Sequence, residues 1–127
     1  MNSHTGIKMD RSLAQKGGIW YETDARGRLC RQKPWLGDVF AGLYDLIMEK
    51  SIFPKTFASD LVLHHRILSD ILGSIKAETV LELGTGSGVA VRWLDPAVEY
   101  SGVDVSPGLL KRAARAFRSA GFESVRL

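Results

Sequence analysis

The chain has 127 residues, which suits one domain, and 45% of them are hydrophobic, which indicates a packed globular core. Lys and Arg number 17 against 14 Asp and Glu, and the net charge of +3 is too small to indicate a broad phosphate-binding surface. The apolar runs are too short for a membrane span, the polar N-terminus lacks a signal-peptide core, and the single cysteine, Cys30, excludes an internal disulfide. The composition therefore favours a cytoplasmic protein without a membrane span.

The first part of the chain divides into a polar arm and a helix. Residues 1–37 are polar and glycine-containing with no sustained apolar period, which predicts a loosely docked arm ahead of a domain formed by residues 38–127. From Asp38 to Lys50 apolar residues recur at the spacing of an amphipathic helix. We expect Pro54 to end that helical segment.

A second helix is predicted from about Ala58 to Ile75, where apolar residues again form one stripe. Ser59 or Thr56 is the expected N-cap. His64 and His65 lie in this helix, and adjacent helical positions point about 100° apart, so the two imidazoles are not expected to share a metal ion.

The rest of the chain alternates between strands and helices. Short apolar runs predict strands, and periodic segments between them predict helices that cover a parallel sheet. In chain order we expect a strand Thr79–Leu83, a short helix from Ser87 to about Leu94, a strand Tyr100–Asp104, a helix capped by Ser106 and ended by Gly121, and the start of a third strand at Val125. The fold class is therefore α/β. Lys111, Arg112, Arg115 and Arg118 form a basic face on the last helix, which we interpret as solvated surface rather than a nucleic-acid interface.

A glycine-rich turn follows the first predicted strand and contains Gly84, Gly86 and Gly88. Glycine permits positive φ and, without a Cβ, lets the backbone approach a ligand closely. Asp104 comes about 20 residues after the first glycine, where a carboxylate at the end of a second strand accepts hydrogen bonds from ribose hydroxyls. The spacing places Val89 or Val91 where a dinucleotide fingerprint needs a small residue, which argues against a nicotinamide-dependent oxidoreductase.

This pattern, Glu-x-Gly-x-Gly-x-Gly after an apolar strand, resembles motif I of the class I S-adenosylmethionine-dependent methyltransferases. Leu81–Gly88 and Tyr100–Leu110 resemble the ubiquinone and menaquinone C-methyltransferase-like branch, and Phe40–Asp45 is similar to its N-terminal helix. The resemblance implies a Rossmann-like parallel sheet with flanking helices, ending after the second βα unit and preceded by N-terminal helices. It also implies an enzyme that transfers the sulfonium methyl group to a small-molecule acceptor.

The resemblance also assigns roles to the site residues. Glu82 would orient the methionine amino group, and Asp104 would hold the ribose. Val105 would lie against the adenine. The turn residues Gly84, Thr85, Gly86, Ser87 and Gly88 would line the methionine and ribose portion, and Tyr44 would lie near the cofactor.

The methyltransferases of this class are similar in having a seven-stranded sheet, and the fourth strand is missing from this sequence. We therefore expect a truncated or partial form that binds S-adenosylmethionine weakly and turns over negligibly. We also expect an open sheet edge that a protein partner or self-association would cover. The alternative is a non-catalytic methyltransferase-like subunit that pairs with a complete methyltransferase.

Overall fold

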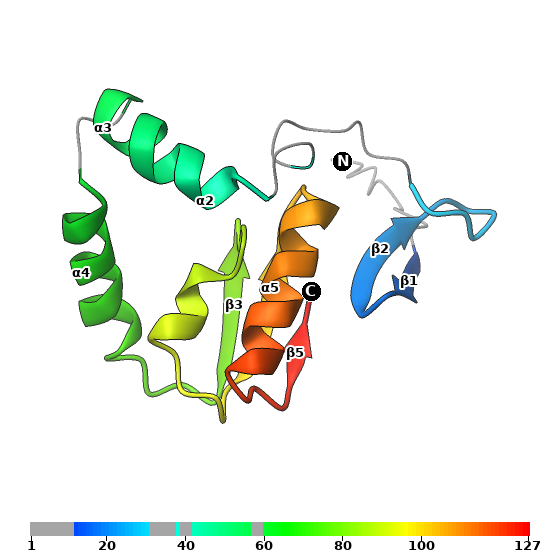
Figure 1. The fold of residues 1–127 in the computed structure, drawn as a ribbon. Helices are drawn as coiled ribbons and strands as arrows, with labels where there is room; N and C mark the ends of the chain where they lie inside the picture. Colours follow the sequence, from blue (N-terminus) through cyan, green and yellow to red (C-terminus); the bar gives the residue numbers. More distant parts are fainter. Residues whose placement is uncertain (1–11, 31–37, 39–41, 57–59) are drawn as a thin grey trace, which may run out of the picture.

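The protein has a mixed α/β fold built around a three-stranded parallel sheet (Figure 1). The computed structural model describes residues 12–30, 38, 42–56 and 60–127. The strands are β3 (Thr79–Leu83), β4 (Glu99–Val103) and β5 (Val125–Arg126), and they lie in the order β3-β4-β5. The predicted strands and the predicted parallel pairing are therefore confirmed, with Leu83 opposite Val103 in the register.

Part of the predicted polar arm forms a β-hairpin instead. Strands β1 (Ser12–Lys16) and β2 (Ile19–Thr23) pair in antiparallel fashion around Gly17 and Gly18, whose φ values are 62° and 82°. Two consecutive residues with positive φ produce the type of two-residue turn that matches the twist of paired strands. Ile19 is only 1% exposed, and the Trp20 N–H donates to the Leu127 carbonyl at 2.5 Å. The hairpin is thus attached to the core beside β5.

The continuous helix predicted from Asp38 to Lys50 is not observed. Three short helical segments follow one another instead: α2 (Tyr44–Ile47), a π-helical segment η1 (Met48–Ile52) and α3 (Phe53–Thr56). Pro54 does not end the helical segment, because it lies within α3, which follows η1 directly. Residues 39–41 of the predicted helix lie outside the described residues.

The second predicted N-terminal helix has a shorter counterpart, α4 (Leu61–Leu72). Its N-cap is Asp60, whose Oδ1 accepts from the Leu63 N–H at 2.5 Å, and not Ser59 or Thr56. The expected pair of N-terminal helices is therefore not supported, since β1 and β2 come first and the first helix is broken into segments. No helix in the described ranges combines the length and the apolarity needed to cross a bilayer.

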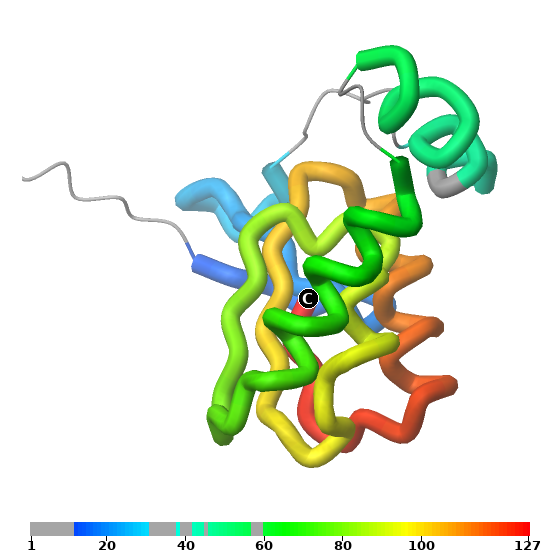
Figure 2. The backbone as a smooth tube through the Cα atoms, turned by 90° about the vertical axis from the view of Figure 1, so that its left-hand side faces the viewer, coloured from blue at the N-terminus to red at the C-terminus, as the bar shows by residue number. Residues whose placement is uncertain are grey.

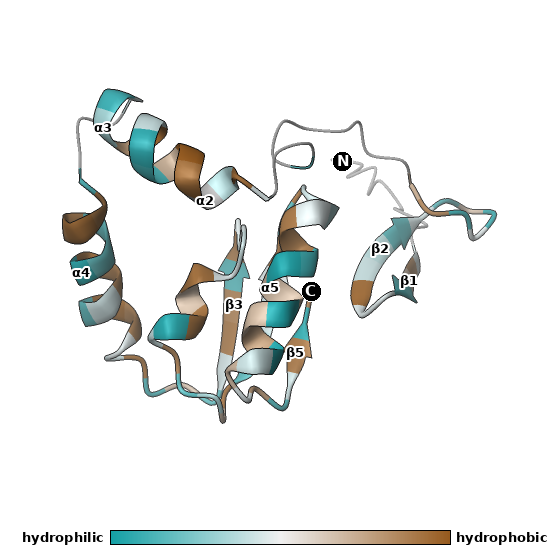
Figure 3. Cartoon of the chain, in the orientation of Figure 1, coloured by the Kyte–Doolittle hydropathy of each residue, from teal (hydrophilic) through white to brown (hydrophobic). Residues whose placement is uncertain are grey.

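The core lies on one face of the sheet, where helix α5 (Pro107–Ser119) packs against the strands (Figure 2). The largest fully buried side chains of the core include Tyr100 from β4 and Phe117 from α5, which stack with ring centroids 4.1 Å apart. On the opposite face Leu81 and Leu83 are 67% and 78% exposed, and β3 carries strongly apolar segments (Figure 3). The described chain therefore covers one side of its sheet and leaves the other side open.

The start of α5 is fastened by a residue from a distant part of the chain. Ser106 is the predicted N-cap, and its Oγ accepts from the Leu109 N–H at 3.2 Å. The same hydroxyl donates to Asp38 Oδ1 at 2.7 Å, and the Gly108 N–H donates to that oxygen at 2.9 Å. A carboxylate at a helix N-terminus is stabilised by the unpaired N–H groups and the helix dipole. Asp38 thus ties the segment before α2 to the second half of the sheet.

We expect Ser106→Ala to lower the free energy of unfolding by about 1–2 kcal/mol, because it removes the N-cap and one donor to Asp38. The measurement is urea denaturation followed by circular dichroism. Ser119→Ala, at the exposed end of the same helix, is the matched control and should change stability by less than about 0.5 kcal/mol. Equal effects of the two substitutions would contradict the described cap.

Candidate functional site

The glycine-rich turn leaves the carboxyl end of β3 and folds back onto β4. Gly84, Gly86 and Gly88 have φ values of 82°, 55° and 84°, a region that favours glycine. The N–H groups of Gly84 and Thr85 both donate to the Val103 carbonyl, at 2.8 and 3.2 Å. The turn is thus held against the end of the neighbouring strand by backbone hydrogen bonds.

Gly88 is required for a second reason, which is space. A Cβ at this position would lie 2.9 Å from the Cα of Ala113, so the turn packs directly against the backbone of α5. At Gly84, in contrast, a Cβ would meet no atom within 4 Å. Close packing therefore fixes one end of the turn, whereas backbone conformation alone explains the glycine at the other end.

The helix predicted from Ser87 begins later and is smaller than expected. Gly88 precedes η2 (Val89–Arg92), which is a single 3₁₀ turn. A helix dipole needs several aligned peptide units, so η2 adds little of the positive field that the sequence suggested. Polar attraction for a ligand must come mainly from side chains and from the amides of the turn itself.

Asp104 follows β4 and bridges two segments with its carboxylate. Its Oδ2 accepts from the Gly86 N–H at 2.8 Å, and its Oδ1 accepts from the Ser106 N–H at 2.8 Å. Each carboxylate oxygen can accept more than one hydrogen bond, so both retain capacity for a further donor. Asp104 therefore lies at the glycine turn, directly after the strand next to β3, although the predicted strand included it.

Glu82 lies on β3 among buried hydroxyl groups. The Tyr100 hydroxyl donates to Glu82 Oε2, and Thr85 Oγ1 lies 3.2 Å from that hydroxyl. Burial raises the pKa of Glu82, the bond from Tyr100 opposes the increase, and the negative charge of Asp104 adds to it. Burial, together with the bond to Glu82, also raises the pKa of Tyr100. The folded structure therefore disfavours the ionised form of Glu82 relative to the protonated form.

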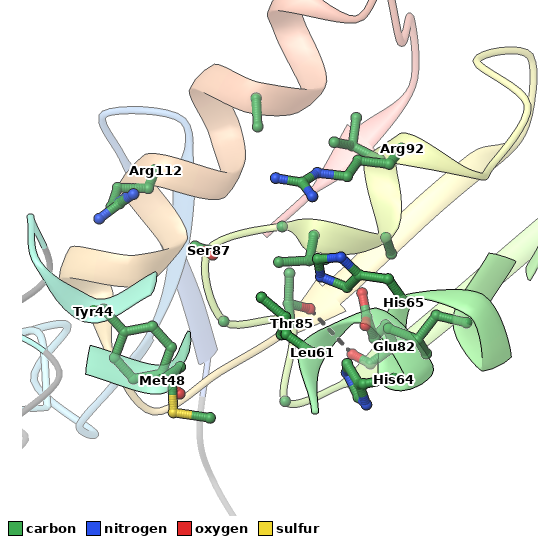
Figure 4. Close-up of a pocket in the computed structure, with 18 of the residues that line it drawn as sticks. Tyr44, Met48, Leu61, His64, His65, Glu82, Thr85, Ser87, Arg92 and Arg112 are labelled. Atoms are coloured by element: carbon green, nitrogen blue, oxygen red, sulfur yellow. Dashed lines mark hydrogen bonds between the residues drawn. The ribbon is translucent and has the colours of Figure 1, made fainter. Parts of the chain in front are cut away.

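A cavity of about 720 Å³ opens beside this turn (Figure 4). Of the predicted site residues, Tyr44, Glu82 and the whole turn from Gly84 to Gly88 line it. Asp104 does not line the cavity but is bonded to Gly86, which does. Val105 does not line it either, and its side chain is 64% exposed. The structure therefore brings most of the predicted residues to one place and leaves Val105 at the surface outside it.

The cavity also contains charged and aromatic residues that the sequence did not single out for this site. His64 and His65 face it from α4, and Arg92 and Arg112 line it from η2 and α5 (Figure 4). Burial lowers the pKa of His65, and the positive charges of Arg92 and His64 lower it further. The packing of α4 and α5 against η2 brings these side chains together, so no local sequence pattern could have identified them.

We expect Gly88→Ala to destabilise the fold by about 3 kcal/mol or more, because the new methyl group meets the α5 backbone and φ is positive. Gly84→Ala, with the same φ penalty and open space, should cost only about 1–2 kcal/mol. Thermal or urea unfolding of both variants measures the difference. Similar losses at the two positions would contradict the close approach of Gly88 to α5.

We expect Glu82→Gln to stabilise the protein at about pH 8 by about 0.5–1 kcal/mol, allowing for solvent screening of this half-buried group. Because the folded-state pKa of Glu82 is raised, its contribution to stability is complete at low pH and is lost as the pH rises through that pKa. The gain from the substitution should therefore disappear near about pH 4. Urea unfolding at both pH values tests this, and a gain that is independent of pH would contradict it.

No protein-family model matches the chain, and no curated protein sequence matches it.

Proposed function

We propose that this chain forms the S-adenosylmethionine-binding half of a class I methyltransferase with a Rossmann-like sheet. The observation that carries the proposal is the bond between Asp104 and Gly86, which joins a carboxylate to a glycine turn across two adjacent parallel strands. In open parallel sheets, ligands bind outside the carboxyl ends of the strands, which is where the turn and the cavity lie.

The residues that line the cavity, together with Asp104 and Val105 next to it, fit the proposed ligand. The volume of about 720 Å³ lies within the range of about 300–1,000 Å³ typical of small-molecule sites. Glu82 offers a carboxylate to an ammonium group, and Asp104 retains acceptor capacity for ribose hydroxyls. Exposed Val105 offers an apolar surface to an adenine ring. Acceptors for the cationic and hydroxyl groups of the ligand are thus present around one turn.

Each residue has a separate role under this proposal. S-adenosylmethionine supplies an electrophilic methyl group on a sulfonium, so the protein mainly has to align the reactants and exclude water. Glu82 would orient the amino-acid end, the Gly84–Gly88 backbone would allow close approach, and Asp104 would fix the sugar. Tyr44 would cover the cavity from α2, where an unidentified small-molecule acceptor would enter.

The proposed binding surface is open, which limits affinity. Gly84 is exposed and Val105 is 64% exposed, so little apolar surface would be removed from water on the nucleoside side. We expect an affinity weaker than the micromolar range and negligible methyl transfer by the isolated chain. Isothermal titration that gave micromolar or tighter affinity would contradict this part of the proposal.

The test of the proposed function is an NMR titration of the ¹⁵N-labelled chain with S-adenosylmethionine. The amide signals of Gly84, Gly86 and Gly88 should shift, and Asp104→Asn should weaken binding about tenfold. Asp24→Asn is the matched control, since Asp24 also accepts two backbone N–H bonds in a turn but does not line the cavity. The proposal would be overturned if S-adenosylmethionine caused no shifts, or if NADH shifted these signals and S-adenosylmethionine did not.

A second candidate function is favoured by the open sheet face. Leu81, Leu83 and Val103 are each more than half exposed on one side of the sheet, and surfaces of this kind commonly mark protein contacts. A non-catalytic methyltransferase-like subunit would use this face to pair with a complete methyltransferase. Co-purification with such an enzyme, lost on Leu83→Lys, would favour this candidate. A monomeric chain that methylates an acceptor unaided would exclude it.

A further inference from the structure

The carboxylate of Glu82 accepts a hydrogen bond from the hydroxyl group of Tyr100, which also lies next to the hydroxyl group of Thr85. The Tyr100 hydroxyl donates to Glu82 Oε2, and Thr85 Oγ1 lies 3.2 Å from the same hydroxyl. Thr85 Oγ1 also lies 3.4 Å from the Glu82 carbonyl oxygen. The three side chains therefore form a small network that begins in the core at Tyr100 and ends at Glu82 in the cavity wall.

This network has little freedom to move. Tyr100 and Thr85 are only 1% and 4% exposed, and the Tyr100 ring stacks on Phe117 at 4.1 Å. A Cβ at Gly102 would collide with Oγ1 of Thr85, so the strand itself leaves room for this hydroxyl. Rigid placement of a donor favours one orientation of the carboxylate that accepts from it.

Charged groups from several elements surround Glu82. Asp104 disfavours its ionised form by charge repulsion, and burial acts in the same direction. The other ionisable residues around the cavity are Glu49, His64, His65, Arg92 and Arg112, from η1, α4, η2 and α5. Among the causes that act most strongly on Glu82, the bond from Tyr100 is the one that favours the charge.

We propose that Tyr100 is a positioning residue that orients the carboxylate of Glu82, so that the site selects ligands with an ammonium group at the amino-acid end. The proposal rests on the function proposed above, and it assigns the selection of that end to a buried core residue. Tyr100 would not touch the ligand. Its effect would reach the ligand only through the protonation state and orientation of Glu82.

The test compares two nucleosides and two tyrosine variants. S-adenosylhomocysteine carries the amino-acid ammonium, whereas 5′-methylthioadenosine lacks the amino-acid part. In Tyr100→Phe the ring is kept and the hydroxyl is lost, so the pKa of Glu82 should rise further. The pH midpoint of S-adenosylhomocysteine binding should then move up by about one unit, which weakens binding about tenfold on the acid side.

Binding of 5′-methylthioadenosine should be the same in Tyr100→Phe and the wild type, which shows that the fold is retained. Tyr21→Phe, outside the cavity lining, should leave both ligands unaffected. Loss of 5′-methylthioadenosine binding as well in Tyr100→Phe would show that Tyr100 supports the whole site, and it would overturn a specific role toward Glu82. If Tyr100→Phe binds both nucleosides normally and the pH midpoint of S-adenosylhomocysteine binding is unchanged, the role of Tyr100 alone is overturned. If the wild type binds neither nucleoside, the proposed function is overturned as well.

Discussion

The carboxylate of Asp104 is the point on which the geometry of the site depends. By accepting from the Gly86 and Ser106 N–H groups, it joins the glycine turn after β3 to the start of α5. These two segments come from successive strand–helix units. Charge-assisted bonds of this kind are short and directional, so they fix relative position as well as adding stability. The turn keeps its shape because a neighbouring strand supplies the acceptor.

The same region shows that the fold retains groups that do not favour its stability. Glu82 is partly buried with a raised pKa, near a second carboxylate, and accepts a hydrogen bond from a tyrosine hydroxyl. Polar groups retained under such conditions are characteristic of functional sites, where charge is placed for a ligand rather than for packing. Stabilisation by Glu82→Gln and loss of selectivity on Tyr100→Phe would be two consequences of one arrangement.

The sequence predicted local features better than long-range ones. The predictions of a strand at Thr79–Leu83 and of Ser106 as the N-cap of α5 were correct, because apolar runs and capping residues act over a few positions. The hairpin around Gly17 was missed although two adjacent glycines were visible, because Ile19 is buried only by contact with distant segments. The prediction of one continuous α-helix from Asp38 to Lys50 was wrong, since periodicity does not reveal where a helix changes its hydrogen-bond pattern.

The site was predicted in the same uneven way. The glycines and Asp104 were identified from spacing, and the structure places them together. Tyr100, His65 and Arg112 were not identified for this site, because their positions depend on how β4, α4 and α5 pack around the turn. No motif describes an arrangement that exists only after the chain has folded. The contact of Asp38 with the first turn of α5 likewise could not be predicted from a motif.

The central claim is that the segment from Glu82 to Gly88 surrounds the amino-acid end of an adenosyl ligand while Asp104 holds its sugar. Intermolecular nuclear Overhauser effects with S-adenosylhomocysteine at saturating concentration test it most directly. We expect contacts from the ribose protons to the amides of Gly86 and Val105, and from the methylene protons of the amino-acid end to Gly84. Ribose contacts confined to the α4 side of the cavity, at His64 and Leu68, would contradict it.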